Sequence, residues 1–543
     1  MRTLMARVRL VVLATLAGVP LAAQQADIAS PVTLSPRVGV EGKPAVTISI
    51  AEAIRMALEQ NPDVLIAKLQ LGASRQDVIA AQGAFDPRVT PLFSYQSATT
   101  PTVSSIGGGS AGSVSQKEVF GSAELSGRTP WAGNRFTVDF SGSRISTNNQ
   151  NVRVNPQFPS SFGATFVQPL LRNLEIDADR RSILLAKRAV DLTDAQLTQV
   201  VMEQLALVEQ AYWELAFAVS NVNVQAEALG QAQAQVASNE RQVQSGTLAV
   251  IDVVEAQTQV ATFEQNLASA QTTLTEAENR LKSLMLTDRN APIWDQPLVP
   301  SLLQDRTPPP MPLDDAVRMA MAKRPELSGL DAQVAQNEID QRFLRNQAKP
   351  QVDLTGSYTL AGLAGTIASR TSTTGTTTTL PGFFEGAFPA SLSNLFARRF
   401  PTAMIQVQMD LPLRNRTAEG NAARSDIEGK VLLQQRKQLE QAIEVEVRNA
   451  LQRVRSAEQR LTAAGSAQRN AREQYDSERR RFDSGLSTVF LVLQRQSALV
   501  AAQGQELRAR ADLNEAIALF DRAVGSTLTQ YGVAIQRDST AGP

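Results

Sequence analysis

The residue types most used in catalysis are missing from this chain. Among its 543 residues there is no cysteine and no histidine, which removes thiol nucleophiles, disulfides, the common zinc sites and the side chain that most often transfers protons near neutral pH. An enzyme would need a pair of acids or a Ser/Lys arrangement instead, and the sequence places neither in a cleft. We therefore predict no catalytic residue, no metal site, no cofactor and no enzymatic activity.

One acidic pair follows a glycine turn and has the spacing to act together. Asp252 comes shortly after Gly246, and Glu255 lies three residues further on, on the same face of a predicted helix. The helix dipole favours an acid in the first turn, so Asp252 also has a purely structural explanation, and Glu255 is more simply a solvated charge. The chain has 53 basic and 53 acidic residues, and this zero net charge gives no reason to expect nucleic acid as a partner.

The N-terminus is typical of a secretory signal peptide. Three arginines precede an apolar run at residues 10–21, and Ala22 and Ala23 follow it. The run is too short to span a membrane comfortably. Further along the chain no window of about 18 uninterrupted apolar residues occurs. We therefore expect an exported bacterial protein, in which any membrane role would need β-strands.

Self-comparison shows two copies of one unit in the same order. Short segments match at offsets of 325 − 62 = 263, 412 − 169 = 243 and 485 − 246 = 239. The decreasing offset places additional residues of the first copy between its helices and its long polar tract. A duplicated unit predicts the architecture before any side-chain chemistry does. The matched pairs are Pro62 with Pro325, Pro169 with Pro412, and Gly246 with Gly485.

Each copy ends in a long proline-free tract rich in Ala, Gln, Glu, Arg and Leu, as helices are. A Ser-Gly pair interrupts each tract once, at Gly246 and Gly485, where left-handed glycine turns one helix into an antiparallel partner. We predict helical hairpins over residues 176–286 and 418–530, with an arm on the order of 100 Å in the first. Their narrow apolar stripes favour coiled-coil neighbours. A stalk without a passage would show the same spacing.

Strands are predicted before each hairpin, over about residues 87–170 and 351–411. Residues 351–360 and 405–411 alternate polar and apolar side chains, over a length that crosses a membrane in a tilted barrel. Residues 118–143 read as an additional hairpin, which could join the barrel or lie outside it. Between the strands at 351–360 and 405–411, in the segment 361–401, the Gly/Thr/Ser-rich stretch at residues 365–382 predicts a long exposed loop. Several aromatic residues would suit a belt at the membrane interface, although burial explains any one of them: Phe93, Tyr95, Phe136, Phe140, Phe166 and Tyr358.

Four strands per chain, or six with the additional hairpin, are fewer than the eight of the smallest membrane barrels. A barrel must therefore be shared between chains. In this arrangement the sequence resembles the TolC family of outer membrane efflux proteins, over nearly the whole chain after the signal peptide. The resemblance rests on the duplicated order, the Gln-Pro-Leu and Leu-Pro-Leu junctions, and the tip sequences SGTLAVIDV (245–253) and SGLSTVFLV (484–492).

The resemblance implies a fold class that is mainly α with membrane β. Duplicated long helical hairpins would form an α-helical barrel or coiled coil, and the strands would contribute to a shared trimeric β-barrel. It also implies a homotrimer in outer membrane lipid, with a helical tunnel extending into the periplasm. The partners would be a periplasmic adaptor protein and an inner membrane transporter. The function would be that of an exit duct for tripartite efflux or type I secretion, carrying small molecules or polypeptides from the periplasm to the outside.

The same resemblance implies roles for residues at the helix tips. Asp252 would be the acidic gate position, with Glu255 as a second candidate, because three symmetry copies around a narrow axis favour cations. The second copy departs from the pattern, since Leu491 and Gln494 stand where aspartates are expected, so a second acidic ring is left open. The tip positions expected to dock the adaptor are Gly246, Leu248, Gly485 and Leu486.

The sequence thus predicts a duplicated chain, and the exported substrate is not specified by it. The alternative from another class is a secreted coiled-coil structural protein or adhesin with short β-regions as caps. The predicted segments are a signal peptide (1–23), an N-terminal linker (24–47), a first repeat (48–287), a Pro-rich equatorial linker (288–312), a second repeat (313–531) and a C-terminal tail (532–543).

Overall fold

The computed structural model describes residues 37–103, 112–301, 306–307, 310–367 and 380–534. The predicted signal peptide lies outside the described residues, as do parts of the N-terminal linker, of the Pro-rich linker and of the C-terminal tail. The chain divides into two compact units, which we describe separately. The first unit is Met1–Gly72, Asp191–Asp331 and Gln434–Pro543, and the second unit is Ala73–Val190 and Ala332–Leu433.

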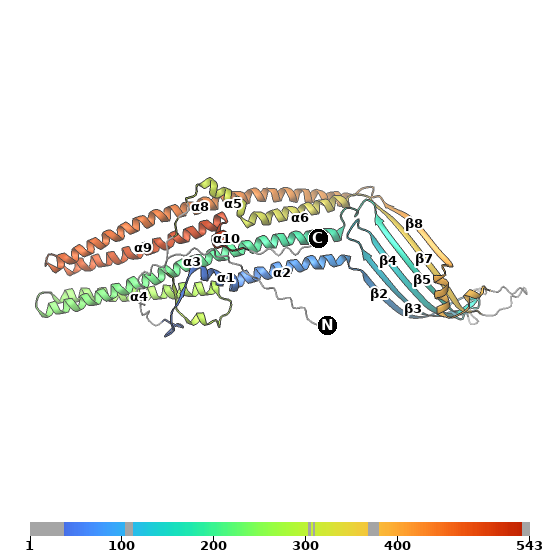
Figure 1. The fold of residues 1–543 in the computed structure, drawn as a ribbon, viewed down its shortest axis with the longest axis horizontal. Coiled ribbons are helices and arrows are strands. Elements are labelled where there is room, and N and C mark those ends of the chain that lie inside the picture. Colours follow the sequence, from blue (N-terminus) through green and yellow to red (C-terminus); the bar gives the residue numbers. More distant parts are fainter. Residues whose placement is uncertain (1–36, 104–111, 302–305, 308–309, 368–379, 535–543) are drawn as a thin grey trace, which may run out of the picture. The chain divides into compact units, whose positions relative to one another are not determined.

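The second unit contains one antiparallel sheet of six strands (Figure 1). The strands follow the order β2-β3-β4-β5-β7-β8, so β2 and β8 are the two edges. Each predicted strand is present, and the hairpin whose place the sequence left open is part of the sheet. The strand bounds are β2 Arg88–Pro101, β3 Ser113–Arg128, β4 Arg135–Thr147, β5 Val154–Pro169, β7 Gln351–Ile367 and β8 Phe400–Asp410.

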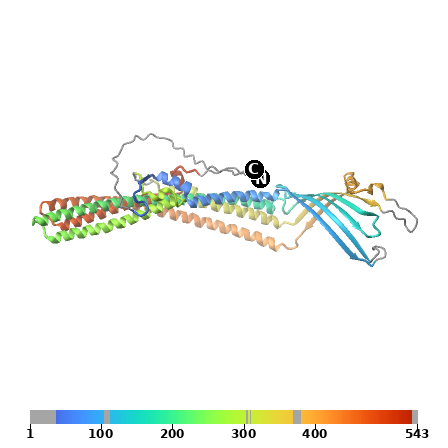
Figure 2. The ribbon, with the colours of Figure 1, turned by 90° about the horizontal axis from the view of Figure 1, so that it is seen from below.

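The prediction of a long exposed loop at residues 365–382, within the segment 361–401, is wrong at its first residues. Strand β7 continues to Ile367, and a short helix, α7 (Phe388–Phe396), follows the turn η3 (Gly382–Phe384). Residues 368–379, the centre of that loop, lie outside the described residues. Helix α7 packs against β5 and β7 on one side of the sheet (Figure 2). Packing onto the strands therefore orders a segment whose composition is typical of a loop.

Long helices join the strands at one end of the sheet. Helix α2 (Pro62–Gln82) precedes β2, and α6 (Pro325–Gln347) precedes β7. Strand β5 leads into α3 (Ala178–Gln244), which turns into α4 (Val250–Met285), while β8 leads into α8 (Arg416–Asp483), which turns into α9 (Val489–Val524). The remaining described helices are α1 (Ile50–Gln60), α5 (Leu313–Lys323), α10 (Thr527–Gln530) and the 3-10 turns η1 (Gly83–Phe85) and η2 (Pro292–Asp295). In the described part of the chain, no helix combines the length and apolar character needed to cross a membrane.

The two copies make equivalent contacts inside the first unit. The Asn61 side-chain amide, just before α2, donates to the Leu284 carbonyl at 2.8 Å. Arg324, just before α6, donates to the Ala523 carbonyl at 3.3 Å. These pairs are related by the sequence offsets of the repeat, since 324 − 61 = 263 and 523 − 284 = 239. The duplication is thus preserved in tertiary contacts as well as in element order.

The segment between the two copies is held against the helices of the first unit. Strand β6 (Leu298–Pro300) pairs in parallel with β1 (Val46–Ile48). The buried Lys282 ammonium donates to the carbonyls of Trp294 and Gln296 at 2.9 and 2.7 Å. Further along, Arg306 pairs with Glu209 and Asp521. These charged contacts fix the described part of this segment as a structural joint.

Candidate functional site: the helix tips and the two-faced sheet

The tips of the two helical hairpins have the same backbone geometry. Gly246 and Gly485 adopt φ of 74° and 72°, the left-handed region that glycine occupies without steric cost. After each helix, a backbone N–H bonds back across the turn, from Thr247 to the Gln242 carbonyl at 2.9 Å and from Leu486 to the Arg481 carbonyl at 2.8 Å. This is the glycine cap expected at a helix C-terminus.

The two tips cap their second helix in different ways. In the first copy Ala249 has no capping side chain, and the Asp252 carboxylate accepts from the Ala249 backbone N–H at 3.3 Å. In the second copy the Thr488 hydroxyl accepts from the Leu491 N–H at 3.4 Å. These are the two halves of a capping box, because an N-cap threonine accepts from the N3 backbone N–H and an N3 acid accepts from the N-cap backbone N–H. Asp252 therefore has a local structural role, and its gate role stays a prediction.

The candidate docking leucines differ in exposure. Leu248 packs against a small core of Ala256, Val489 and Leu493, which brings the two tips into contact. Leu486 is 72% exposed, and Glu255 is also exposed on α4. Other large apolar side chains at the tips are exposed as well, namely Val250, Ile251, Val254 and Phe490. An uncovered apolar surface of this kind marks an interaction site.

The sheet has one apolar and one polar face. Residues paired across neighbouring strands point to the same face, and the row Phe136, Phe166, Ile405 illustrates the apolar one. Ile405 is 84% exposed, so this part of the face is uncovered, whereas helix α7 packs on the same face at its far end. All six aromatic residues singled out from the sequence lie on it: Phe93, Tyr95, Phe136, Phe140, Phe166 and Tyr358.

The opposite face of the sheet is polar. The row Thr137, Thr165, Ser357 shares it with Asp139. Nearly all the charged residues of the strands belong to this face: Arg88, Glu118, Glu124, Arg128, Arg135, Asp139, Asp353 and Asp410. A sheet with one exposed apolar face and one charged face suits a boundary between lipid and water.

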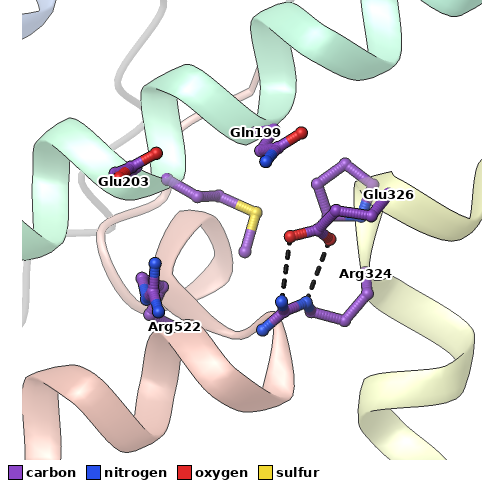
Figure 3. Close-up of a pocket in the computed structure, with 7 residues that line it drawn as sticks. Gln199, Glu203, Arg324, Glu326 and Arg522 are labelled. Atoms are coloured by element: carbon purple, nitrogen blue, oxygen red, sulfur yellow. Dashed lines mark hydrogen bonds and ion pairs between the residues drawn. The ribbon is translucent and has the colours of Figure 1, made fainter. Parts of the chain in front are cut away.

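A pocket in the first unit has a structural explanation (Figure 3). Its volume of about 20 Å³ holds about one water. The Arg324 guanidinium binds the Glu326 carboxylate with two nitrogens, at 2.9 and 3.0 Å, and also contacts Glu446, which bonds to Arg522. No group of acidic side chains in the described chain is arranged to hold a metal ion. The pocket is therefore part of an ion-pair network and offers no substrate site.

The comparisons with known proteins agree with this geometry. The family model described as "Outer membrane efflux protein" matches residues 135–285 and 316–526. The chain belongs to the outer membrane efflux protein family. The two matched segments contain both helical hairpins and four of the six strands of the large sheet, so the family resemblance and the outer membrane location expected from the sequence are confirmed. Members of this family are channels rather than enzymes.

Solved structures share the fold at low sequence identity. The CmeC outer membrane channel of Campylobacter jejuni matches with a TM-score of 0.61 and 14% identity, over 95% of this chain and 95% of that one. VceC of Vibrio cholerae matches with a TM-score of 0.59 and 16% identity, over 88% and 96%. The MtrE channel of Neisseria gonorrhoeae matches with a TM-score of 0.57 and 16% identity, over 88% and 89%. No relative was found among curated protein sequences. The predicted fold class is confirmed, while closure of a barrel between chains stays a prediction.

Proposed function

We propose that three copies of this chain form an exit duct that carries small molecules or polypeptides across the outer membrane. The duct would receive its cargo from an inner membrane transporter through a periplasmic adaptor protein. The observation that carries the proposal is the six-stranded sheet, which has an apolar face, a polar face and two unpaired edges. A secreted structural protein or adhesin would not need an exposed apolar sheet face, and the family assignment also argues against that alternative.

The unpaired edges explain why the chain must assemble. Strands β2 and β8 each pair on one side only, and their free backbone groups cannot remain unpaired in lipid. Pairing β2 of one copy with β8 of the next removes both edges in a closed ring. Three copies of six strands give 3 × 6 = 18 strands, and barrels of 16–18 strands enclose a water-filled channel. The polar face would line that channel.

Engineered cysteines test this pairing cleanly because the chain has none of its own. Ser94 on β2 and Thr402 or Gln406 on β8 lie on the polar face. In the trimer, oxidation of Ser94→Cys combined with Thr402→Cys or Gln406→Cys should yield covalent dimers and trimers at one register. Ser122→Cys on the internal strand β3, combined with the same β8 cysteines, is the matched control and should not cross-link. A monomeric protein that forms no cross-link at any register would refute the shared barrel.

The proposed gate needs a test that separates charge from capping. Asp252→Asn keeps an acceptor for the Ala249 N–H and removes the charge, whereas Thr488→Ala removes the other tip's cap and leaves all charges. If the three Asp252 carboxylates line a constriction, Asp252→Asn lowers the cation preference of the single-channel current in planar bilayers, and Thr488→Ala does not. Glu255→Gln on the same helix tests the second candidate. Equal ion selectivity in wild type and Asp252→Asn would exclude the gate.

Adaptor docking is proposed for the tips, at Gly246, Leu248, Gly485 and Leu486. The exposure of Leu486 supports it, because no described residue of the chain covers that side chain. Leu486→Glu should abolish adaptor-dependent export in cells and leave the current of the purified channel unchanged. Leu248→Glu is the contrasting variant, since it disrupts the core between the tips. Export that continues at the wild-type rate in Leu486→Glu would remove this residue from the docking surface.

A further inference from the structure

Two cations break the pattern of the apolar sheet face. Among the charged residues of the six strands, only Lys117 on β3 and Arg144 on β4 lie on that face. Both side chains are exposed, and neither has an ion-pair partner among the described residues. The strands place no acid on this face. Since lysine and arginine are costly at the centre of the hydrocarbon layer and much less so near its interfaces, their position requires an environment at or beyond the edge of the apolar band.

Their height along the strands provides that environment. Arg144 lies eight residues beyond Phe136, the first aromatic of the apolar face on β4, which is about 27 Å along a strand and roughly 21 Å along the membrane normal at a 40° tilt. The apolar band of a membrane barrel is about 25 Å tall. Phe136 is at the end where the helices attach, and Trp131 is 67% exposed in the adjoining turn. Arg144 therefore lies close to the opposite edge of this band. Lys117, which pairs with Ser146 two residues further along β4, lies about 26 Å from Phe136 along the normal, just beyond that edge. Both cations are at the rim opposite the helices.

Helix α7 lies against the same face, next to this rim. A row of small residues, Gly142, Ser160 and Gly362, runs across β4, β5 and β7. The Ser160 hydroxyl bonds to the Ser391 hydroxyl of α7 at 2.7 Å, and a side chain added at Gly142 would meet the Phe388 ring at 2.6 Å. The small residues thus leave room for α7 to cross the strands close to the sheet. Gly142, which contacts α7, is two residues before Arg144 on the same face of β4.

The exposed end of α7 has an interfacial composition. Phe396 is 72% exposed, and Arg398 and Arg399 follow it, both exposed. The Arg399 guanidinium lies 4.6 Å from the centre of the Phe383 ring. On β2, Tyr95 shares a register row with Val119 and Arg144. Aromatic rings combined with cations are typical of the level where acyl chains meet polar headgroups.

We infer that Lys117 and Arg144, flanked by α7, bind the anionic phosphate groups of outer-leaflet lipid headgroups. The inference rests on the proposed function, because it takes the apolar face as lipid-facing and the helix-bearing end as periplasmic. Charge complementarity selects the occupant, since this rim offers exposed cations without an acid on the strands. A protein partner would have to displace lipid from a surface that is continuous with the apolar band. Free phosphate lacks the acyl chains that the adjoining band would contact.

The test compares two lipids that differ only in phosphate. The trimer is reconstituted in phosphatidylcholine nanodiscs containing bis-phosphorylated lipid A or its dephosphorylated form, and the lipids retained on release are counted by native mass spectrometry. Wild type should retain the phosphorylated form preferentially. Lys117→Gln combined with Arg144→Gln should lower that preference by roughly thirty-fold, since one basic residue near a charged membrane surface changes affinity about five-fold. Arg88→Gln with Arg135→Gln, on the polar face, is the matched control and should keep it.

Three results would overturn the inference. These are equal retention of both lipids by wild type, an unchanged preference in the Lys117→Gln/Arg144→Gln variant, and displacement of the lipid by inorganic phosphate alone. Channel current in planar bilayers, measured on the same preparations, separates this inference from the proposed function. A protein that conducts without preferring the phosphorylated lipid refutes only the lipid site. A protein that never conducts refutes the channel itself.

Discussion

Lys282 in α4 provides the strongest test of how the joint between the two copies is held. Its ammonium is fully buried, 2.5 Å from the Glu278 carboxylate, and it donates to the carbonyls of Trp294 and Gln296. Glu278 is also buried and keeps a second partner, the Arg37 guanidinium at 2.6 Å. Lys282→Met would therefore remove a buried cation and leave two carbonyls without a donor.

The expected cost can be estimated from these contacts. Removing one partner of a buried ion pair destabilises a protein by about 3–5 kcal/mol. The lower half of that range applies here, because Arg37 continues to neutralise Glu278. A loss of about 3 kcal/mol in a unit of this size corresponds to a fall in melting temperature of roughly 4–5 °C. Circular dichroism of the purified protein in detergent measures this fall in melting temperature.

The exposed Lys437 on α8 is the matched control. Lys437→Met removes the same charge from a solvated position, where substitutions change stability by about 0.5 kcal/mol or less. If Lys282→Met melts within about 2 °C of Lys437→Met, the buried network does not anchor the linker. The reasoning about the joint would then be wrong.

Substitutions at three further positions test other parts of the structure. Asn61→Asp keeps the acceptor that caps α2 but loses the donor to the Leu284 carbonyl, whereas Asn61→Ala loses both. In thermal melts we expect the free energy of unfolding to fall by about 1–2 kcal/mol for Asn61→Asp and by about 2–4 kcal/mol for Asn61→Ala. Equal losses would contradict the separation of the two roles. Burial raises the pKa of Glu209 from its ordinary 4.5 to about 7 despite the adjacent Arg306, so the folded state holds this proton more tightly than the unfolded state. The stability that this proton contributes is complete below the unfolded-state pKa and is lost as the pH rises through about 7, by at most on the order of 3 kcal/mol. The melting temperature of Glu209→Gln relative to that of wild type should therefore increase from pH 4.5 to 7. A constant difference between the two melting temperatures would exclude this titration. Gly485→Val should lower the free energy of unfolding by about 1–2 kcal/mol, because Gly485 has a positive φ, and Gly485→Asn should lower it by less. Melting temperature is the readout. Equal losses in the two variants would mean that backbone strain is not the cause.

The sequence predicts the length of a strand correctly where its apolar face is continuous and underestimates that length where the apolar face is interrupted. In β5, the alternation of Phe162, Ala164 and Phe166 with Gly163 and Thr165 indicates a strand only from residue 162 onward. The strand begins at Val154, and its first half carries Ser160 on the apolar face. Alternation is lost there because the small residue makes room for α7. Packing against a helix elsewhere in the chain therefore removes the apolar alternation by which a strand is recognised, and the sequence of the strand alone does not show that contact.

Helix α7 itself could not be predicted for the same physical reason. Its nine residues contain a proline and three serine or asparagine residues, which favour loops and caps, and an isolated helix of that length is unstable in water. It is held by Leu395, which is fully buried, and by the Asn394 amide, which donates to the carbonyls of Leu363 and Phe383. Long-range packing decides the structure of this segment. The cations at the rim were missed as well, although the alternation around Lys117 already put it on the side of Val119.

The two helix tips differ in how their second helix is capped, although they are copies of one repeat. Where the second copy has Leu491 in place of an aspartate, it also has Thr488 in place of Ala249. The helix start that Asp252 stabilises in one copy is stabilised by a hydroxyl in the other. Loss of the second acid is therefore compensated locally and needs no change in the hairpin. It follows that any carboxylate ring at position 252 of a trimer would carry three charges rather than six, and ion selectivity in this protein would depend on the first copy alone.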